Sequence, residues 1–247
     1  MKAMILAAGL GTRLRPLTDD RPKALVEVAG HTLLEDVLAR LRVFGVNEVI
    51  VNAHHHAEMI VEYLKANDNF GIRIEVSREE ELLDTGGGLK RAASFFGAGS
   101  QEPFILHNVD VISDIDLGRM VLFHLEKAAL ATLAVQDRPT SRYLLFDDSG
   151  RLCGRRAGPG GQAELVRSVE RVQPLAFSGI HVISPKIFAK LTENGAFSII
   201  DAYLRFVAEG EKIIAFRADG CNWRDLGRPE SLVEAARDLA NGRTSGA

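Results

Sequence analysis

The stretch "LAAGLGTRLRPLTDDRPKAL", residues 6–25, decides how the rest of the chain is interpreted. An apolar strand runs into a turn with glycines at positions 9 and 11, and basic residues follow around two prolines. Glycines let backbone N–H groups approach phosphate or base oxygens closely. Because ligands of open parallel sheets bind at the carboxyl ends of the strands, this turn predicts an anion site there.

The turn departs from the dinucleotide-binding fingerprint. That motif needs Gly-x-Gly-x-x-Gly, whereas position 14 is leucine, and Pro16 comes too early for a long helix to continue. The loop presents Arg13 and Lys23 instead. The pyrophosphate of a dinucleotide needs little cationic help, but a triphosphate undergoing displacement needs more. A Walker loop is excluded because no Gly-Lys-Ser/Thr follows.

Strands alternate with helices from this stretch to residue 135, which predicts a parallel sheet covered on both faces. Expected strands cover residues 2–7, 47–53, 72–76 and 103–110, and expected helices cover 32–45, 56–67, 86–97 and 120–135. Thr32 and Glu35 have the spacing of a capping box, and Gly45 is the expected stop of that helix. The apolar stripe of residues 120–135 is expected to pack in the core.

The regular alternation of predicted strands and helices ends after residue 135. We expect a hairpin over 141–153, a loop over 157–162, strands over 175–184 and 212–218, helices over 198–210 and 229–242, and a frayed end over 242–247. The fold class expected is a Rossmann-like, three-layer α/β/α arrangement with a mixed, mostly parallel central sheet. No linker divides the chain, so residues 1–247 are expected to form a single domain.

Composition excludes several function classes. A net charge of −3 gives no basic field for nucleic acid, and no apolar run approaches the roughly 18 residues of a membrane span. The first residues lack a signal-peptide cleavage region, and Cys153 and Cys221 have neither disulfide-framework nor C-x-x-C spacing. We therefore expect a cytoplasmic protein with reduced thiols, and the sequence leaves its oligomeric state open.

"GLGTRLRPLT" (residues 9–18) followed by "RPKALVEVAG" (residues 21–30) resembles the motif of the sugar-1-phosphate nucleotidylyltransferases, also called nucleotide-sugar pyrophosphorylases. The first segment fits throughout, and the second departs at Glu27, where the family usually has proline. The resemblance implies transfer of a nucleoside monophosphate from an NTP to a sugar 1-phosphate, with release of pyrophosphate. It further implies a nucleotide half over residues 1–137, a sugar-binding embellishment over about 138–220, and a C-terminal part over 221–247.

A second glycine-rich loop, "ELLDTGGGLK" (residues 81–90), looks like the family's Leu-Gly-Thr-x-Gly nucleotide loop, with Asp84 at the first glycine. This variant resembles N-acetylmuramate-1-phosphate uridylyltransferases and is near mannose and heptose guanylyltransferases, so UTP and GTP both stay open. Asp84 or Thr85 also suits the N-terminus of a helix. The nucleotide-binding residues implied by the resemblance are Leu6, Ala8, Gly9, Gly11, Thr12, Arg13, Lys23, Glu79, Thr85 and Gly86.

Two aspartates have the metal-binding role in the resemblance. Asp110 ends "HNVD" (residues 107–110), where Val109 replaces the family's glycine, and Asp225 lies in "NWRDLGRPESL" (residues 222–232), which resembles Trp-x-Asp-x-Gly-Thr-Pro. Two hard oxygen ligands with water and phosphate oxygens suit Mg²⁺, the expected cofactor. The adjacent histidines at positions 54–56 lack a ligand spacing and predict only a polar strand exit.

The sugar side carries weaker sequence signals. Asn108, Ser178 and Gly179 are the sugar-binding residues that the resemblance implies. The family's Glu-Lys-Pro, whose lysine binds the sugar phosphate, has no clear match, and Arg142 or Arg171 is a possible substitute.

The mechanism implied is an in-line displacement without a side-chain base, because the attacking phosphate is already anionic. Arg13 is expected to hold the leaving phosphates and Lys23 the α-phosphate. Three alternatives stay open. They are a non-catalytic nucleotide-sugar-binding relative, a cytidylyltransferase for a small phosphorylated alcohol, and an NAD-dependent dehydrogenase.

Overall fold

The computed structural model of this chain describes residues 1–97 and 99–240. Within them, ten strands form one mixed sheet in the order β11-β10-β9-β12-β6-β1-β4-β5, with β8 paired to β12 and β13 paired to β8. These strands are β1 Lys2–Leu6, β4 Glu48–Ala53, β5 Arg73–Arg78, β6 Phe104–Asn108, β8 Ala131–Gln136, β9 Arg142–Phe146, β10 Leu152–Ala157, β11 Ala163–Leu165, β12 Gln173–Ile183 and β13 Ile213–Arg217.

Strand direction confirms the mixed, mostly parallel sheet. The neighbours β5, β4, β1 and β6 are all parallel, as are β8 and β13. Antiparallel pairing begins at β12, which joins β6, β8 and β9, and continues from β9 through β10 to β11. Relative to β1, therefore, only β12 and β10 run in reverse among the described strands of this sheet.

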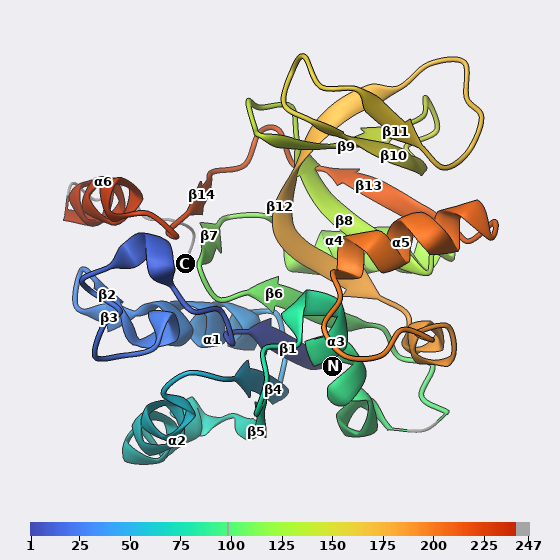
Figure 1. Cartoon of the computed structure of the whole chain (residues 1–247). Helices are drawn as coiled ribbons and strands as arrows, with labels where there is room; N and C mark the ends of the chain where they lie inside the picture. The colour runs from blue at the N-terminus through green and yellow to red at the C-terminus, as the bar shows by residue number, and fades with distance from the viewer. Residues whose placement is uncertain (98, 241–247) are drawn as a thin grey trace.

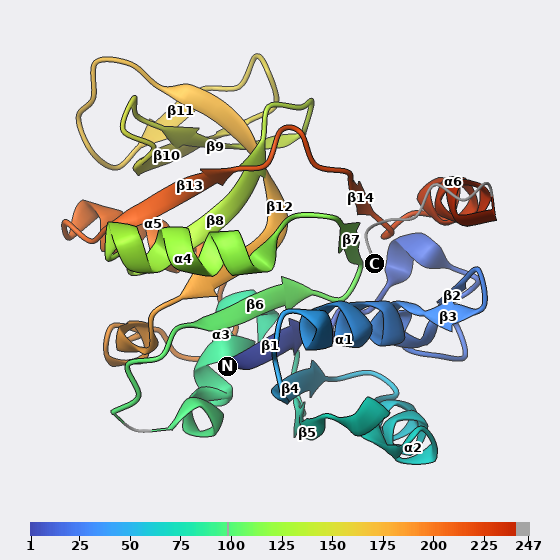
Figure 2. The same cartoon turned by 180° about the vertical axis from the view of Figure 1, so that it is seen from behind.

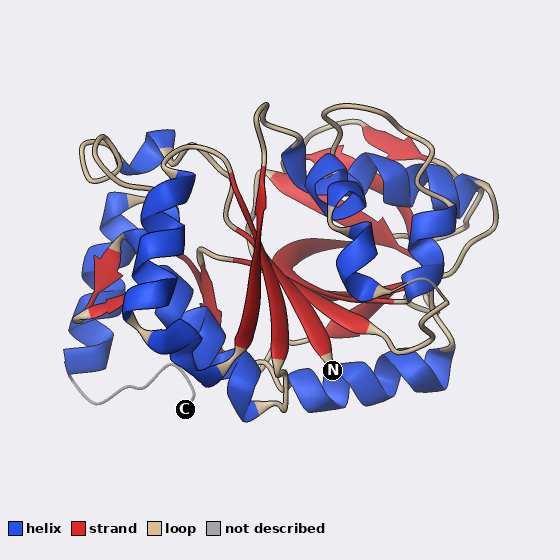
Figure 3. Cartoon of the chain, turned by 90° about the horizontal axis from the view of Figure 1, so that it is seen from below, coloured by secondary structure: helices blue, strands red, loops and turns tan. Residues whose placement is uncertain are grey.

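Helices cover both faces of the sheet (Figures 1 and 2). The helices are α1 Leu33–Val43, α2 Ala57–Ala66, α3 Asp84–Arg91, α4 Leu117–Lys127, α5 Ile199–Ala208 and α6 Pro229–Ala240. Helices α3 and α5 lie on one face, and α1 and α4 lie on the other, so the strands fan out between two helical layers (Figure 3). No described helix is long and apolar enough to cross a lipid bilayer.

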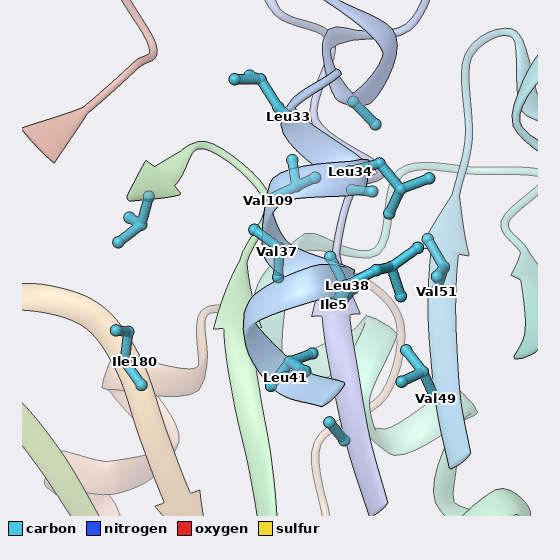
Figure 4. Packing of buried hydrophobic residues seen from close by; sticks show 14 of the residues in the cluster. Ile5, Leu33, Leu34, Val37, Leu38, Leu41, Val49, Val51, Val109 and Ile180 are labelled. Atoms are coloured by element: carbon cyan, nitrogen blue, oxygen red, sulfur yellow. The ribbon is translucent and has the colours of Figure 1, made fainter. Parts of the chain in front are cut away.

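The packing of α1 against the sheet shows why β1 carries continuous apolar sequence. Alternate side chains of a strand point to opposite faces, so Ile5 packs with α1 while Met4 belongs to the cluster on the other face. Leu34 and Leu38 of α1 lie over β1 and β4 (Figure 4). Burial on both faces holds β1 in the centre of the sheet. The glycine turn follows directly after the carboxyl end of this strand.

Helix α1 begins as its sequence predicts. Thr32 Oγ1 accepts a hydrogen bond from the backbone N–H of Glu35 at 3.1 Å. The reciprocal half of the expected capping box is replaced, because the Glu35 carboxylate contacts His31 Nδ1 and the Tyr63 hydroxyl. Gly45, with φ +76°, follows the helix as expected.

The expected helix over residues 120–135 is wrong in its second half. Helix α4 ends at Lys127, Ala128 takes the left-handed conformation, and the following apolar run forms β8. A fully buried strand and a helix look alike in so short an apolar segment. Leu122 and Leu125 of α4 are also exposed, contrary to the core packing expected.

Several other elements differ from their predicted bounds. The helix expected over 86–97 is α3 followed by a 3₁₀ turn, η4 Ala93–Phe96. The sequence reasoning missed β11 and two small two-stranded sheets, β2 Glu27–Val28 with β3 His31–Thr32 and β7 Val111–Ser113 with β14 Trp223–Asp225. The hairpin over 141–153 is confirmed by β9 and β10. The expected fraying of residues 242–247 lies outside the described residues.

The further 3₁₀ helices are η1 Thr12–Leu14, η2 Lys23–Leu25, η3 Asp68–Gly71 and η5 Pro185–Ala189. The range 138–220 does not form a separate layer, because β9 to β13 extend the same sheet that contains β1. The division at residues 137 and 220 stays a prediction of which part of the chain binds the nucleotide and which part binds the sugar.

Candidate active site

A cleft of about 460 Å³ opens at the carboxyl ends of β1 and β6. These parallel neighbours place Leu6 beside Asn108, as expected for a ligand site of a parallel sheet. The predicted site residues that line the cleft are Leu6, Ala8, Gly9, Lys23, Thr85, Asn108 and Asp110. They share the lining with Ala7, Asn52, Leu82, Asp84, Val109 and Ala196.

Glycine occurs at positions 9 and 11 of the first loop for different physical reasons. Gly11 has φ +64°, and a Cβ there would lie 2.9 Å from Thr18 Cγ2, so both its conformation and its space require glycine. Thr18 Oγ1 closes the same turn by donating to the Gly11 carbonyl oxygen at 2.9 Å. Gly9 has no atom within 4 Å of an added Cβ, and it lines the cleft. The loop therefore turns at Gly11 and stays open at Gly9.

Lys23 and Asp110 meet inside the cleft. The ammonium of Lys23, at the start of η2, forms an ion pair with Asp110 Oδ2. Both side chains are largely buried, at 12% and 14% exposure. Asp110 follows β6 at the turn into β7, so a charged pair stands where β6 ends. The arrangement shows that the Asp110 carboxylate accepts a cation at this position.

Asp225 reaches the same place from the far end of the chain. Strand β14 pairs with β7 so that Asp225 lies opposite Val111, and the Leu226 N–H donates to the Asp110 carbonyl oxygen at 2.7 Å. A Cβ added to Gly227 would lie 2.7 Å from Asp225 Oδ1 and 3.2 Å from Asp110 Oδ2. Carboxylate oxygens of both predicted metal ligands thus lie close to the same position beside Gly227.

Arg13 belongs to the same cluster. Its Nη2 would lie 2.8 Å from that added Cβ of Gly227. Together with Lys23, two cations and two carboxylates gather where the glycine loop, β6 and β14 meet. Gly227 is therefore small because charged side-chain ends occupy the space around it. Thr12 opens η1 beside Arg13 and does not line the cleft.

Glu79 is buried and hydrogen-bonded in the loop before α3. Its side chain is 5% exposed, Oε1 accepts from Asn52 Nδ2 at 2.7 Å, and Oε2 accepts from the Leu83 N–H at 3.1 Å. Glu79 therefore holds the loop before α3, and it is not among the residues that line the cleft.

Asn52 lines the cleft and was not predicted from the sequence. It is the last residue but one of β4 and is 2% exposed. Its Oδ1 accepts from the Ala7 N–H at 2.7 Å. One amide thus joins the loop after β1 to Glu79. The available signal was a polar residue near the carboxyl end of a buried strand.

The second glycine loop packs against Phe197 and the start of α5. The Gly86 N–H donates to the Phe197 carbonyl oxygen at 2.9 Å, and a Cβ on Gly86 would collide with the Phe197 ring. Thr85 lines the cleft, while its Oγ1 accepts from the Ile199 N–H at the start of α5. Gly86 is thus explained by close helix packing, and its buried N–H is already bonded.

Asp84 explains the sequence variant of this loop. Its φ of +57° is the left-handed conformation in which glycine is favoured and aspartate is tolerated. Oδ1 accepts from the Thr85 N–H at 2.6 Å, so Asp84 supports the start of α3 as expected, with Leu83 as the formal N-cap.

The predicted sugar-binding residues are neighbours, but they differ in access. Asn108 lines the cleft, and Gly179 has φ +74° with its missing Cβ 2.9 Å from Asn108 Nδ2. Ser178 is fully buried, and its carbonyl oxygen accepts from Trp223 Nε1 at 2.7 Å. Ser178 therefore supports β14 through its backbone, and its side chain does not reach the cleft.

The histidine triplet is a polar strand exit, as predicted. His54 Nδ1 contacts the Glu79 carbonyl oxygen, and His56 takes the left-handed conformation before α2. Among the described residues, no three His, Cys, Asp or Glu side chains gather as a metal cluster. Arg142 and Arg171 are exposed and do not line the cleft.

Cations and carboxylates at the strand ends of a mainly parallel sheet are typical of α/β enzymes that bind phosphates. The chain belongs to the nucleotidyl transferase family, whose model matches residues 2–242, and within it to the sugar-1-phosphate nucleotidyltransferases. This membership confirms the resemblance in residues 9–18 and 21–30 and excludes the dehydrogenase alternative. The family generally uses a divalent metal ion.

Three similar proteins illustrate the relationship. N-acetylmuramate alpha-1-phosphate uridylyltransferase of Caulobacter vibrioides is 35% identical, with 96% of each chain covered. Probable mannose-1-phosphate guanylyltransferase 2 of Arabidopsis thaliana is 32% identical, and the match covers 96% of this chain but 64% of the plant protein. The crystal structure of HddC from Yersinia pseudotuberculosis complexed with GMP-PN has a TM-score of 0.76 at 23% identity, covering 96% and 99% of the two chains.

Proposed function

We propose that this enzyme transfers a nucleoside monophosphate from UTP or GTP to a sugar 1-phosphate, with Mg²⁺ as its metal ion. UTP with N-acetylmuramate 1-phosphate is the first substrate pair to test, because the uridylyltransferase of that name is 35% identical over nearly the whole of both chains. A phosphate oxygen of the sugar 1-phosphate attacks the α-phosphorus of the NTP. The bond from the α-phosphorus to the bridging oxygen breaks, and pyrophosphate leaves with the electron pair.

Lys23 is proposed to neutralise charge on the α-phosphate. Its ammonium is positioned in the cleft between the glycine loop and Asp110, and its contact with Asp110 holds it there before substrate binds. A cation that is positioned in advance stabilises developing charge without reorganising during the reaction.

Arg13 is proposed to hold the leaving β- and γ-phosphates. It follows the turn at Gly11, and its guanidinium lies near the carboxylates of Asp110 and Asp225 beside Gly227. The planar guanidinium offers several donors to phosphate oxygens, so it suits a group that must leave in a defined direction. Gly9, Ala8 and Leu6 then line the cleft along the nucleotide.

Asp110 and Asp225 fit a Mg²⁺ ion. Both offer hard carboxylate oxygens at one point, and Lys23 already places a cation against Asp110. Mg²⁺ takes one or two protein carboxylates and completes its shell with water and substrate phosphates, so a third acidic ligand is not needed. When bound, the ion would supply charge neutralisation at the phosphate oxygens.

The meeting of Asp110, Asp225 and Arg13 beside Gly227 is the observation that carries this proposal. The experiment is a matrix of four NTPs against glucose, mannose and N-acetylmuramate 1-phosphates, with phosphocholine as a further arm and pyrophosphate release as the readout. Turnover of a sugar 1-phosphate with UTP or GTP is the expected result. Turnover of phosphocholine with CTP, or nucleotide binding without turnover in any arm, would favour the remaining alternatives. The cytoplasmic location stays a prediction.

A further inference from the structure

A half-buried arginine lies against β14, the strand that carries Asp225. Arg138 follows β8, and its guanidinium carbon stacks 3.5 Å from the centre of the Trp223 ring. Its Nη2 donates to the Phe177 carbonyl oxygen on β12 at 2.9 Å. The guanidinium is thus fixed between β12 and β14 by one hydrogen bond and one stacking contact.

The positive charge of Arg138 has no ion-pair partner among the described residues. Its Nε is buried and has no hydrogen-bond acceptor within that part of the chain. A buried donor without an acceptor costs free energy, and a partly buried charge without an ion-pair contact is incompletely compensated. An anion bound at the guanidinium would supply that contact.

The Trp223 contact places Arg138 beside the candidate metal site. Trp223 and Asp225 are two positions apart on β14, so their side chains project from the same face of that strand. Burial lowers the pKa of Arg138, and the negative charge of Asp225 opposes that effect. The guanidinium still remains charged, because arginine keeps its proton far above neutral pH.

The backbone around Arg138 is held in place by several bonds. Gln136 Nε2 donates to the carbonyl oxygens of Ala218 and Cys221 at 2.8 and 2.9 Å, which joins the end of β8 to the turn before β14. Trp223 Nε1 donates to the Ser178 carbonyl oxygen, which joins β14 to β12. Arg138 is therefore presented by a rigid frame, unlike the exposed Arg142 and Arg171.

The two sets of cations approach the aspartates from different elements. Arg13 and Lys23 come from the N-terminal loops, whereas Arg138 comes from β8 and rests on β12. Both views of the fold show β14 between these two regions (Figures 1 and 2). An anion held by Arg138 would thus lie near Asp225 on the side away from the glycine loop.

We propose that Arg138 binds the phosphate group of the sugar 1-phosphate and positions it for attack on the α-phosphorus. This proposal rests on the function proposed above. Arg138 then takes the part of the lysine that the sequence lacks, and the stacking contact with Trp223 holds the guanidinium in place. Its free N–H groups suit two phosphate oxygens at once.

The test uses Arg138→Gln, with Arg142→Gln and Arg171→Gln as matched controls. We expect Arg138→Gln to raise the KM for the best sugar 1-phosphate of the substrate matrix about 10- to 100-fold, a typical loss for a hydrogen-bonded charge. The KM for the NTP is expected to change less than about threefold. Arg138→Lys should recover only part of the loss, because an ammonium keeps the charge but loses the fork and the stacking. Both control variants should keep the wild-type KM.

Calorimetry with the same sugar 1-phosphate supplies a readout that is independent of turnover, and circular dichroism verifies folding of each variant. Weaker sugar 1-phosphate binding in Arg138→Gln with unchanged NTP binding supports the assignment. An unchanged KM in a folded and active Arg138→Gln overturns it and leaves the proposed function intact, as does a rise in KM confined to an Arg142 or Arg171 variant. Wild-type protein without turnover of any sugar 1-phosphate would remove both proposals.

Discussion

The backbone N–H of Leu226 donates to the carbonyl oxygen of Asp110 at 2.7 Å. This bond fixes the register between a C-terminal strand and the end of β6, and it sets Asp225 beside Asp110 without any contribution from the two carboxylates. Like charges are thus brought together by backbone pairing, and the cations Lys23 and Arg13 offset their repulsion.

Asp110→Asn and Asp225→Asn are each expected to lower kcat/KM by at least ~10²-fold, because each removes a charge that the cluster uses to hold Mg²⁺. Since both act through one ion, the double variant should be little worse than the worse single variant. Raised Mg²⁺ should restore part of the activity of either single variant. Initial rates over a magnesium titration check this expectation, and additive losses, or full wild-type activity in excess chelator, would contradict it.

Lys23→Ala is expected to lower kcat by at least ~10²-fold, the usual loss for one positioned electrostatic donor. Removing the ammonium also leaves Asp110 without its observed partner, so the variant must be verified as folded by thermal denaturation. Pyrophosphate release at saturating substrates measures the effect. Wild-type kcat in a folded variant would reject the role at the α-phosphate.

Arg13→Ala is expected to weaken NTP and pyrophosphate binding by about 10-fold or more while sparing the sugar 1-phosphate, because the leaving phosphates lose a charged donor. Titration calorimetry with each ligand separates the two halves of the site. The reverse pattern would move Arg13 to the sugar side and contradict the assignment of Arg138 as well.

Gly227→Ala is expected to reduce kcat/KM more than ~10-fold with a small change in Tm. The new methyl group would lie 2.7 to 3.2 Å from Asp225, Arg13 and Asp110, whose side-chain ends must then move apart. Gly220→Ala is the matched control, because an added Cβ there has no atom within 4 Å. Equal activity of the two variants would show that the spacing of the charged cluster is unimportant.

Three buried histidines predict a pH dependence of stability. Burial lowers the pKa of His107 and His124 to about 4 and that of His181 to about 3, against 6.5 for an ordinary imidazole. The unfolded chain therefore binds more protons below pH 6.5, and the free energy of unfolding should fall as the pH drops from 6.5 toward 4. The expected loss at pH 5 is on the order of 1–2 kcal/mol per histidine.

Urea unfolding at pH 7 and pH 5 measures that loss. His124→Gln removes one titrating group while offering a donor and an acceptor near Thr132 Oγ1, which His124 Nδ1 contacts at 2.9 Å. This variant should therefore lose less stability than the wild type between the two pH values. An equal or larger loss would show that the buried imidazole is not responsible.

The sequence predicts best what depends on local conformation and composition. The turn at Gly11, the cap at Thr32 and the buried strand β1 are each specified within a few residues, and all are present. The segment 120–135 failed because apolar periodicity does not distinguish a buried strand from a helix, and the left-handed Ala128 between them has no local sequence signal.

Within the candidate site, motif positions located Lys23, Asp110 and Asp225 but did not indicate Asn52 or Arg138. Asn52 and Arg138 make hydrogen bonds to residues 27 or more positions away, and such contacts depend on strand order. Glu79 and Gly86 show the converse. Each belongs to a motif, and each serves the packing of the loop and helix around the cleft.

The late position of β14 also bears on the order in which the enzyme becomes active. Arg13, Lys23 and Asp110 leave the ribosome first, and Asp225 follows Asp110 by 115 residues, or on the order of ten seconds of synthesis. β13, the last strand of the central sheet, already ends at Arg217. Asp225 is therefore synthesised after every strand of the central sheet, and the acidic pair is completed only when β14 pairs with β7.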